Sequence, residues 1–160
     1  MKTLQRLVPC VLFLVIVLMS CGPVFAGESA TADECKAQVQ KAVDLAAKMG
    51  IEKAIQTLND PKGPFVWKDS YVFCLDLDKR LVIAHPTNPK LIGKDWAMSA
   101  KDVKGKMFFA EFVKVSQDPG EGWVEYWWPK PGETEASKKN AYVLKVPGMP
   151  YSMGAGAYTE

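Results

Sequence analysis

The spacing of apolar residues changes once along this 160-residue chain, and that change decides the fold class. Between residues 31 and 58, apolar side chains recur every three or four positions, which is the spacing of one face of an α-helix. Residues 59–64, "NDPKGP", stop this pattern with two prolines and a glycine. The apolar runs that follow are mostly short, rich in β-branched and aromatic residues, and separated by turns. The chain is therefore predicted to begin with a helix and to continue as a sheet.

The helical segment has a defined start and an internal break. Thr31 and Glu34 have the spacing of a capping box, in which each side chain binds the backbone of the other. Gly50 is expected to bend or break the helix, because glycine is a poor helix former. The apolar face on the two sides of this break consists of Cys35, Val39, Ala42, Val43, Ala46 and Met49, then Ile51, Ala54, Ile55 and Leu58.

The remainder predicts an antiparallel sheet with one more helix. Residues 71–77 and 81–85 form a hairpin with a three-residue loop. Residues 106–117 carry a helical stripe at positions 108, 112 and 115. Three further strands are expected at 122–128, 140–146 and 151–158. The predicted fold class is α+β, with the long N-terminal helix packed on one face of a five-stranded antiparallel sheet. The opposite face, covered by a loop and a short helix, is the expected place for a pocket.

The N-terminus is predicted to be an export signal. Lys2 and Arg6 precede an apolar run, residues 7–19, which is shorter than a bilayer-spanning helix needs. Cleavage after Ala26 would give a signal peptide over residues 1–26 and a single domain over residues 27–160. Alternatively, the chain is cleaved before Cys21, because residues 18–21 resemble the lipobox of bacterial lipoproteins. The protein is thus expected in the periplasm, attached to the membrane only if Cys21 is lipidated.

Charge and cysteine content narrow the possible partners. The formal net charge of +2 disappears when Lys2 and Arg6 leave with the signal peptide, so no nucleic-acid partner is expected. Cys35 and Cys74 are disulfide candidates in an oxidising compartment, the alternative being two buried free thiols. No metal site is predicted, because the cysteines and the single histidine lack short ligand spacings such as C-x-x-C.

Catalytic constellations are not recognisable. His85 is the only histidine, and no serine lies in a Gly-x-Ser-x-Gly elbow. Asp76 and Asp78 flank the predicted hairpin, where acidic residues are ordinary turn formers. Glu125 has no acidic neighbour in sequence. The chain is therefore predicted not to be an enzyme and to need no cofactor.

Aromatic residues with polar atoms suggest a small-molecule pocket instead. His85 and Lys94 flank a Pro/Gly-rich loop that follows the hairpin, and both can donate hydrogen bonds to a carboxylate. An apolar pocket with a few convergent polar groups is typical of ligand sites. The alternative is that the rings are core residues whose polar atoms bind the backbone. The aromatic set consists of Trp67, Tyr71, Trp123, Tyr126, Trp127, Trp128 and Tyr142.

An ordered set of short motifs resembles the single Cache domain, the extracytoplasmic sensor module of bacterial chemoreceptors and histidine kinases. The resemblance covers nearly all of residues 31–158. The motifs are Tyr71-Val-Phe-x-x-Asp76, Ala84-His85-Pro86, Asn88-Pro89-x-Leu91-Ile-Gly93-Lys94, Asp102-x-x-Gly105-Lys106-x-Phe108-Phe109, Gly122-Trp123-Val124-x-Tyr126-x-Trp128-Pro129, Lys139-x-x-Tyr142-Val143 and Gly154-x-Gly156-x-Tyr158. One departure is the turn after Asp76, which reads Asp-Lys-Arg where the family often has a glycine.

The resemblance implies a PAS-like fold of a long helix on a five- or six-stranded antiparallel sheet, with the ligand on the other face. It implies binding of a small organic acid or an amino acid, without catalysis, in signal transduction or chemotaxis. The implied ligand-binding positions are Trp67, Tyr71, His85, Lys94, Trp123, Tyr126 and Tyr142.

Because no output domain follows, a free-standing periplasmic Cache protein is expected. It would act through a membrane chemoreceptor or histidine kinase. The alternative is a ligand-independent interaction module that docks on such a receptor, its pocket filled by its own side chains.

Overall fold

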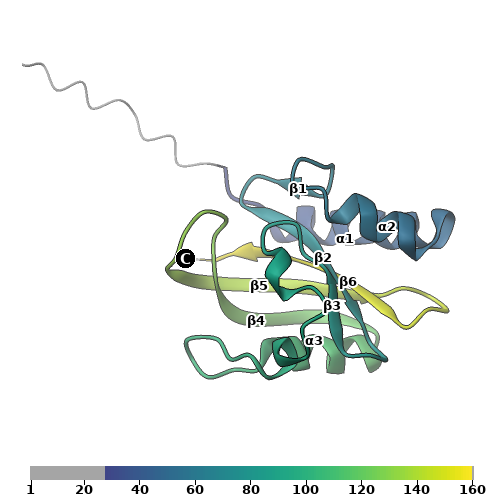
Figure 1. The fold of residues 1–160 in the computed structure, drawn as a ribbon. Coiled ribbons are helices and arrows are strands. Elements are labelled where there is room, and N and C mark those ends of the chain that lie inside the picture. The colour runs from purple at the N-terminus through teal and green to yellow at the C-terminus, as the bar shows by residue number, and fades with distance from the viewer. Residues whose placement is uncertain (1–27, 160) are drawn as a thin grey trace, which may run out of the picture.

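The computed structural model of the protein describes residues 28–159. Two helices lie on one side of an antiparallel sheet and a third helix lies on the other side (Figure 1). The predicted signal peptide, its cleavage position after Ala26 and the lipidation candidate Cys21 lie outside the described residues. No helix within the described part is long and apolar enough to cross a membrane.

The N-terminal helix forms as predicted, in two segments. Helix α1 is Ala32–Met49 and helix α2 is Ile51–Leu58. Thr31 Oγ1 accepts a hydrogen bond from the Glu34 backbone N–H at 3.2 Å, and Glu34 Oε2 accepts one from the Thr31 N–H at 2.9 Å. Gly50 separates the helices with a φ of 86°, a conformation that glycine adopts without strain. Capping box and break are both confirmed.

The sheet has six strands, all paired antiparallel. The spatial order is β1-β2-β6-β5-β4, and β3 pairs with β2. The strands are β1 (Val66–Trp67), β2 (Ser70–Asp76), β3 (Leu81–Ala84), β4 (Glu121–Pro129), β5 (Ala136–Lys145) and β6 (Tyr151–Tyr158). Helix α3 is Phe108–Gln117, and two 3₁₀ helices, Pro89–Leu91 and Asp95–Ser99, lie in the loop before it.

The predicted α+β class is confirmed, and the six strands agree with the five- or six-stranded sheet that the family resemblance implies. The hairpin forms with a four-residue loop, residues 77–80, where a three-residue loop was predicted. Two strands differ from the prediction based on residue patterns. The two-residue strand β1 is a sixth member of the sheet, because Val66 and Trp67 pair with the start of β2. Strand β5 begins at Ala136, four residues before the predicted start at 140. Its first part, "ASKK", has the composition of a turn, but the nine-residue pairing with β4 extends it.

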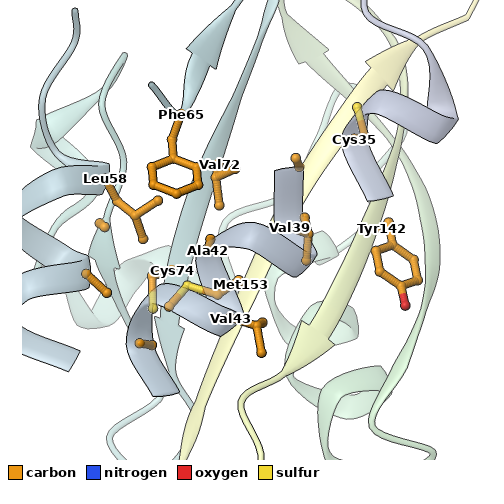
Figure 2. Packing of buried hydrophobic residues seen from close by; sticks show 14 of the residues in the cluster. Cys35, Val39, Ala42, Val43, Leu58, Phe65, Val72, Cys74, Tyr142 and Met153 are labelled. Atoms are coloured by element: carbon orange, nitrogen blue, oxygen red, sulfur yellow. The ribbon is translucent and has the colours of Figure 1, made fainter. Parts of the chain in front are cut away.

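Two apolar clusters lie on the two faces of the sheet. Figure 2 shows the first, in which Val39 and Val43 of α1 lie near Met153 of β6. The second cluster lies beneath α3 and contains Phe108, Phe112 and Tyr126. Because neighbouring residues of a strand point to opposite faces, odd-numbered residues of β2 and β5 and even-numbered residues of β4 face α3.

The expected disulfide is not formed. Cys35 and Cys74 are both free thiols in the α1-side cluster, and Figure 2 shows them well apart, with Val39 and Ala42 of α1 between them. Cys35 Sγ lies 3.8 Å from Ser70 Oγ, and Cys74 Sγ lies 3.9 Å from the carbonyl oxygen of Leu75. Burial raises the pKa of both thiols. The alternative reading, two buried free thiols, describes the structure.

Candidate functional site

Lys139 of β5 is completely buried, which is rare for a lysine. It lies in a row across three strands, paired with Tyr126 of β4 on one side and Tyr158 of β6 on the other. Its side chain runs over Gly156, where an added Cβ would lie 2.8 Å from Lys139 Cε. The missing side chain at Gly156 therefore makes room for the stem of Lys139.

The ammonium group of Lys139 is surrounded by aromatic rings. Its Nζ lies 4.3 Å from the ring centre of Tyr71 and 4.6 Å from that of Tyr158. It donates one long hydrogen bond, 3.4 Å, to Tyr158 Oη. Within residues 28–159, Lys139 forms no ion pair. Burial lowers its pKa to about 7, an effect that the nearby Cys35 and Asp69 oppose.

His85 brings a neutral hydrogen-bond donor to the same place. Its position after β3 is fixed by its backbone N–H, which donates to Asn59 Oδ1 at 3.0 Å. Its Nδ1 accepts a hydrogen bond from the Asn88 N–H at 3.1 Å, so the neutral ring carries its proton on Nε2. Burial, and then the charge of Lys139, lowers the pKa of His85 to about 3. The ring centre lies 4.7 Å from that of Tyr71.

Aromatic side chains from β4 and α3 form the remaining wall. The ring of Tyr126 stacks on Phe108 with 4.6 Å between centres. Trp128 lies 5.4 Å from Phe108 and 6.1 Å from His85, measured between ring centres. Burial raises the pKa of Tyr71 to about 12 and that of Tyr126 well above its ordinary value, so both hydroxyls remain protonated at neutral pH. We call the set Tyr71, His85, Tyr126, Trp128, Lys139 and Tyr158 the Lys139 site.

A cavity of about 180 Å³ lies outside this wall. Trp128 lines it, and so does Thr87, whose side chain contacts the Tyr71 hydroxyl. Tyr158 borders the same region, because its hydroxyl donates to the carbonyl oxygen of Pro129, another lining residue, at 2.6 Å. The full lining is Thr87, Asn88, Trp128, Pro129, Lys130, Pro131, Gly132 and Glu133. The cavity thus borders the Lys139 site at Trp128, the one member of the site in its lining.

The structure brings three of the seven predicted ligand-binding residues together: Tyr71, His85 and Tyr126. Lys94 is an exposed residue of the loop before α3, although the sequence placed it beside His85. Trp67 packs against the α1-side cluster.

Trp123 and Tyr142 also lie away from the Lys139 site. They are cross-strand partners on the α1 side of the sheet, with ring centres 5.2 Å apart. The Tyr142 hydroxyl donates to Glu121. Burial, reinforced by Glu121, raises the pKa of Tyr142 to about 12. Strand alternation separates this pair from Tyr126.

The seven predicted ligand-binding positions omit three members of the site, Lys139, Tyr158 and Trp128, although Trp128 belonged to the aromatic set that suggested a pocket. All three occur in the motifs that carry the family resemblance, but their chemistry depends on burial. The available signal was the pair Gly154 and Gly156, since small residues in a strand mark close approach of another group. The approaching groups are the Phe73 ring, 2.3 Å from a Cβ built at Gly154, and the Lys139 stem.

The Lys139 site contains the chemical groups that recognition of an anion requires. It combines one buried cation with neutral donors from tyrosine and histidine, which suits a carboxylate. Among residues 28–159, no three His, Cys, Asp or Glu side chains are grouped so as to hold a metal ion.

Comparison with known proteins agrees with this fold. A family model described as Cache domain matches residues 28–160. The chain is also similar to the methyl-accepting chemotaxis protein McpP of Pseudomonas putida, with 33% identity over 92 residues. That alignment covers 58% of this chain and 16% of the receptor, so the chain spans a small part of that relative.

Solved structures give the same result. A Cache chemosensory domain described in terms of carboxylic acid recognition is 31% identical, with a TM-score of 0.67, covering 80% of this chain and 92% of the other. A periplasmic sensor domain of a chemotaxis protein is 30% identical, with a TM-score of 0.62 and coverage of 78% and 88%. A methyl-accepting chemotaxis protein from Vibrio parahaemolyticus, 23% identical with a TM-score of 0.65, shares the fold.

Proposed function

The chain belongs to the Cache domain family, and we propose that it is an extracytoplasmic sensor domain that binds a small carboxylate at the Lys139 site. Its relatives are sensor domains of chemotaxis receptors. In this proposal the chain acts by binding, without catalysis, and passes its signal to a membrane chemoreceptor or histidine kinase.

The observation that carries the proposal is the burial of Lys139 without an acidic partner. A buried cation is strongly unfavourable unless an opposite charge or several hydrogen bonds compensate it. The direct contacts that compensate the charge of Lys139 Nζ in the described residues are the rings of Tyr71 and Tyr158 and one long hydrogen bond to the Tyr158 hydroxyl. A carboxylate at Nζ would supply the missing charge, and the Tyr71 hydroxyl and His85 Nε2–H are neutral donors for its second oxygen.

The charge of the site favours a carboxylate over an amino acid. Lys139 is the one buried lysine or arginine in residues 28–159. The ammonium group of an amino acid would have to lie near this cation. His85 makes binding of an amino acid still less favourable, because its neutral ring donates a hydrogen bond at Nε2 and cannot accept one there from the ligand's ammonium group. The nearest acidic group is Asp69, one of whose oxygens already accepts the Ala30 N–H at 2.7 Å.

A second candidate function is ligand-independent docking on a receptor. The packing around Lys139 favours it, because the ring centres of Tyr71 and Tyr158 already lie 4.3 Å and 4.6 Å from Nζ. In that case these rings are permanent occupants of the pocket, and the fold serves as an interaction module.

Thermal unfolding with and without acids separates the two candidates. The purified protein is screened with acetate, propionate, pyruvate and glycine. A ligand that binds only the folded state raises the melting temperature, and a shift of several degrees is expected for at least one acid. Glycine should produce none.

Two neighbouring lysines provide a matched pair of variants. Lys139→Met should abolish the shift. Lys138→Met should keep it, because Lys138 is half exposed and pairs with Glu125 at 2.9 Å on the opposite face. If no acid shifts the melting temperature of the folded protein, carboxylate binding is wrong and receptor docking is the better reading.

A further inference from the structure

The surroundings of Lys139 do little to hold a full positive charge. Nζ is shielded from water, and its single acceptor lies at the long end of the hydrogen-bonding range. Aromatic faces attract a cation, but burial still makes the charged form less stable than it is in water. The lowered pKa of Lys139 has this cause.

Titratable groups lie near Lys139 on several elements. Those on the strands and on α1 are uncharged near neutral pH, since burial raises the pKa of Tyr71, Tyr126, Tyr158 and Cys35. His85 is neutral as well. The nearby acid is Asp69, in the turn between β1 and β2, and Lys130 Nζ lies 3.9 Å from it. Asp69 is therefore already shared with a second lysine. Within residues 28–159, no ion pair compensates the charge of Lys139.

We propose that a small monocarboxylate binds at Lys139 together with one proton. This inference rests on the proposed function of the Lys139 site. In the empty site near neutral pH, a substantial fraction of Lys139 is the neutral amine. The carboxylate arrives with its negative charge, the amine nitrogen takes a proton from solvent, and an ammonium–carboxylate pair results. The net charge of the buried site, compared with the neutral amine, does not change.

The requirement for a neutral buried site also determines how many negative charges the ligand can carry. One proton and one lysine neutralise one carboxylate, so a second carboxylate would be buried without a cation. A dicarboxylate such as succinate should bind much more weakly than propionate. The domain would thus respond to a monocarboxylic acid most strongly when the surroundings are acidic.

Isothermal titration calorimetry measures the proton directly. Acetate and propionate are titrated into the protein at about pH 6 and about pH 8, each in two buffers of different ionisation enthalpy. The difference in heat gives the protons taken up per bound acid. We expect an uptake near zero at the lower pH and approaching one at the higher pH. Affinity should fall by up to about tenfold per pH unit above 7.

Two variants isolate Lys139. Lys138→Met should bind the acid with the same proton uptake as the wild type. Lys139→Arg carries a permanent charge and should bind the acid without proton uptake, because a guanidinium does not deprotonate in proteins. Should the larger guanidinium prevent binding, nitrogen NMR of the wild-type lysines replaces it. The Lys139 signal is expected to change from amine to ammonium when acid is added at about pH 8.

The outcomes distinguish this inference from the function on which it rests. Binding of either acid at about pH 8 without proton uptake, at an affinity equal to that at about pH 6, overturns the inference and leaves the proposed function standing. If proton uptake persists in Lys139→Arg, a group other than Lys139 takes up the proton, and the inference is also overturned. If neither acid binds at either pH, the proposed function fails and the inference fails with it.

Discussion

Tyr158 connects Lys139 to the edge of the sheet through two hydrogen bonds. Its hydroxyl accepts one from Lys139 Nζ at 3.4 Å and donates one to the carbonyl oxygen of Pro129 at 2.6 Å. The ring also lies against Nζ. Tyr158 thus links the buried amine to Pro129, a residue that lines the outer cavity.

Tyr158→Phe should destabilise the fold modestly while retaining the ring. Loss of the hydroxyl leaves Lys139 Nζ without its acceptor and Pro129 without this donor, an effect of about 1–2 kcal/mol. Urea denaturation measures the change in the free energy of unfolding. Tyr151→Phe is a suitable control, because Tyr151 lies at the other end of β6. Equal stability of Tyr158→Phe and the wild type would show that these hydrogen bonds contribute nothing.

Gly154→Ala should destabilise the protein through a steric clash. A Cβ at this position would lie 2.3 Å from Cζ of Phe73, a buried residue directly opposite on β2. Overpacking of this kind costs about 1–3 kcal/mol. Phe73→Leu combined with Gly154→Ala should cost less than the two single changes together, because the smaller side chain removes the clash. Strict additivity in the double-mutant cycle would contradict this account.

The fold was largely predictable because its signals are local. The capping pair Thr31 and Glu34, the break at Gly50 and the hairpin before His85 depend on residues close in sequence. Strand β1 was missed because its two residues carry no pattern of their own. They become a strand by pairing with β2.

The candidate site was predictable only in part because it depends on strand register. The composition around Lys139 resembles that of a turn, and only the pairing of β5 with β4 and β6 carries this lysine into the core. Trp123 was chosen for its ring, yet it is 40% exposed, on the opposite face from Tyr126. The pairing of the whole sheet determines whether a side chain is buried and to which face it points. Residue type alone does not specify either property.

Cys35 and Cys74 should behave as protected free thiols. Both are buried, and burial raises the pKa of each, so little reactive thiolate forms. Iodoacetamide should leave both cysteines unmodified in the folded protein and alkylate both in urea without a reductant. Peptide mass spectrometry gives the result for each residue. A Cys35–Cys74 cross-linked peptide from the unreduced protein would contradict the structure.

His85 should make the protein sensitive to acid. Its pKa is about 3 in the folded state and ordinarily 6.5, so the unfolded chain binds more protons between these values. The stabilising effect is complete above pH 6.5 and is lost as the pH falls toward 3. His85→Gln, which cannot titrate, should lose less stability over this range than the wild type. Parallel urea titrations at a series of pH values make the comparison, and equal slopes for both proteins would contradict it.

Lys139 should also make the folded protein more stable as the pH rises, but over a higher pH range than His85. Its pKa is about 7 in the folded protein and ordinarily 10.5, so the unfolded chain binds the extra proton in this interval. Stability should therefore rise as the pH increases from about 7 to about 9, by up to about 1.4 kcal/mol per pH unit.

Above that range the buried thiols and phenols oppose the rise, because burial raises the pKa of these acids. Lys139→Met removes the titrating group and should abolish the rise, whereas Lys138→Met should keep it. Because the methionine also removes a buried cation, Lys139→Met should be at least as stable as the wild type near pH 7. A wild-type stability that is flat between about pH 7 and about pH 9 would mean that Lys139 stays charged in the folded protein. It would also remove the basis for proton-linked binding of the ligand.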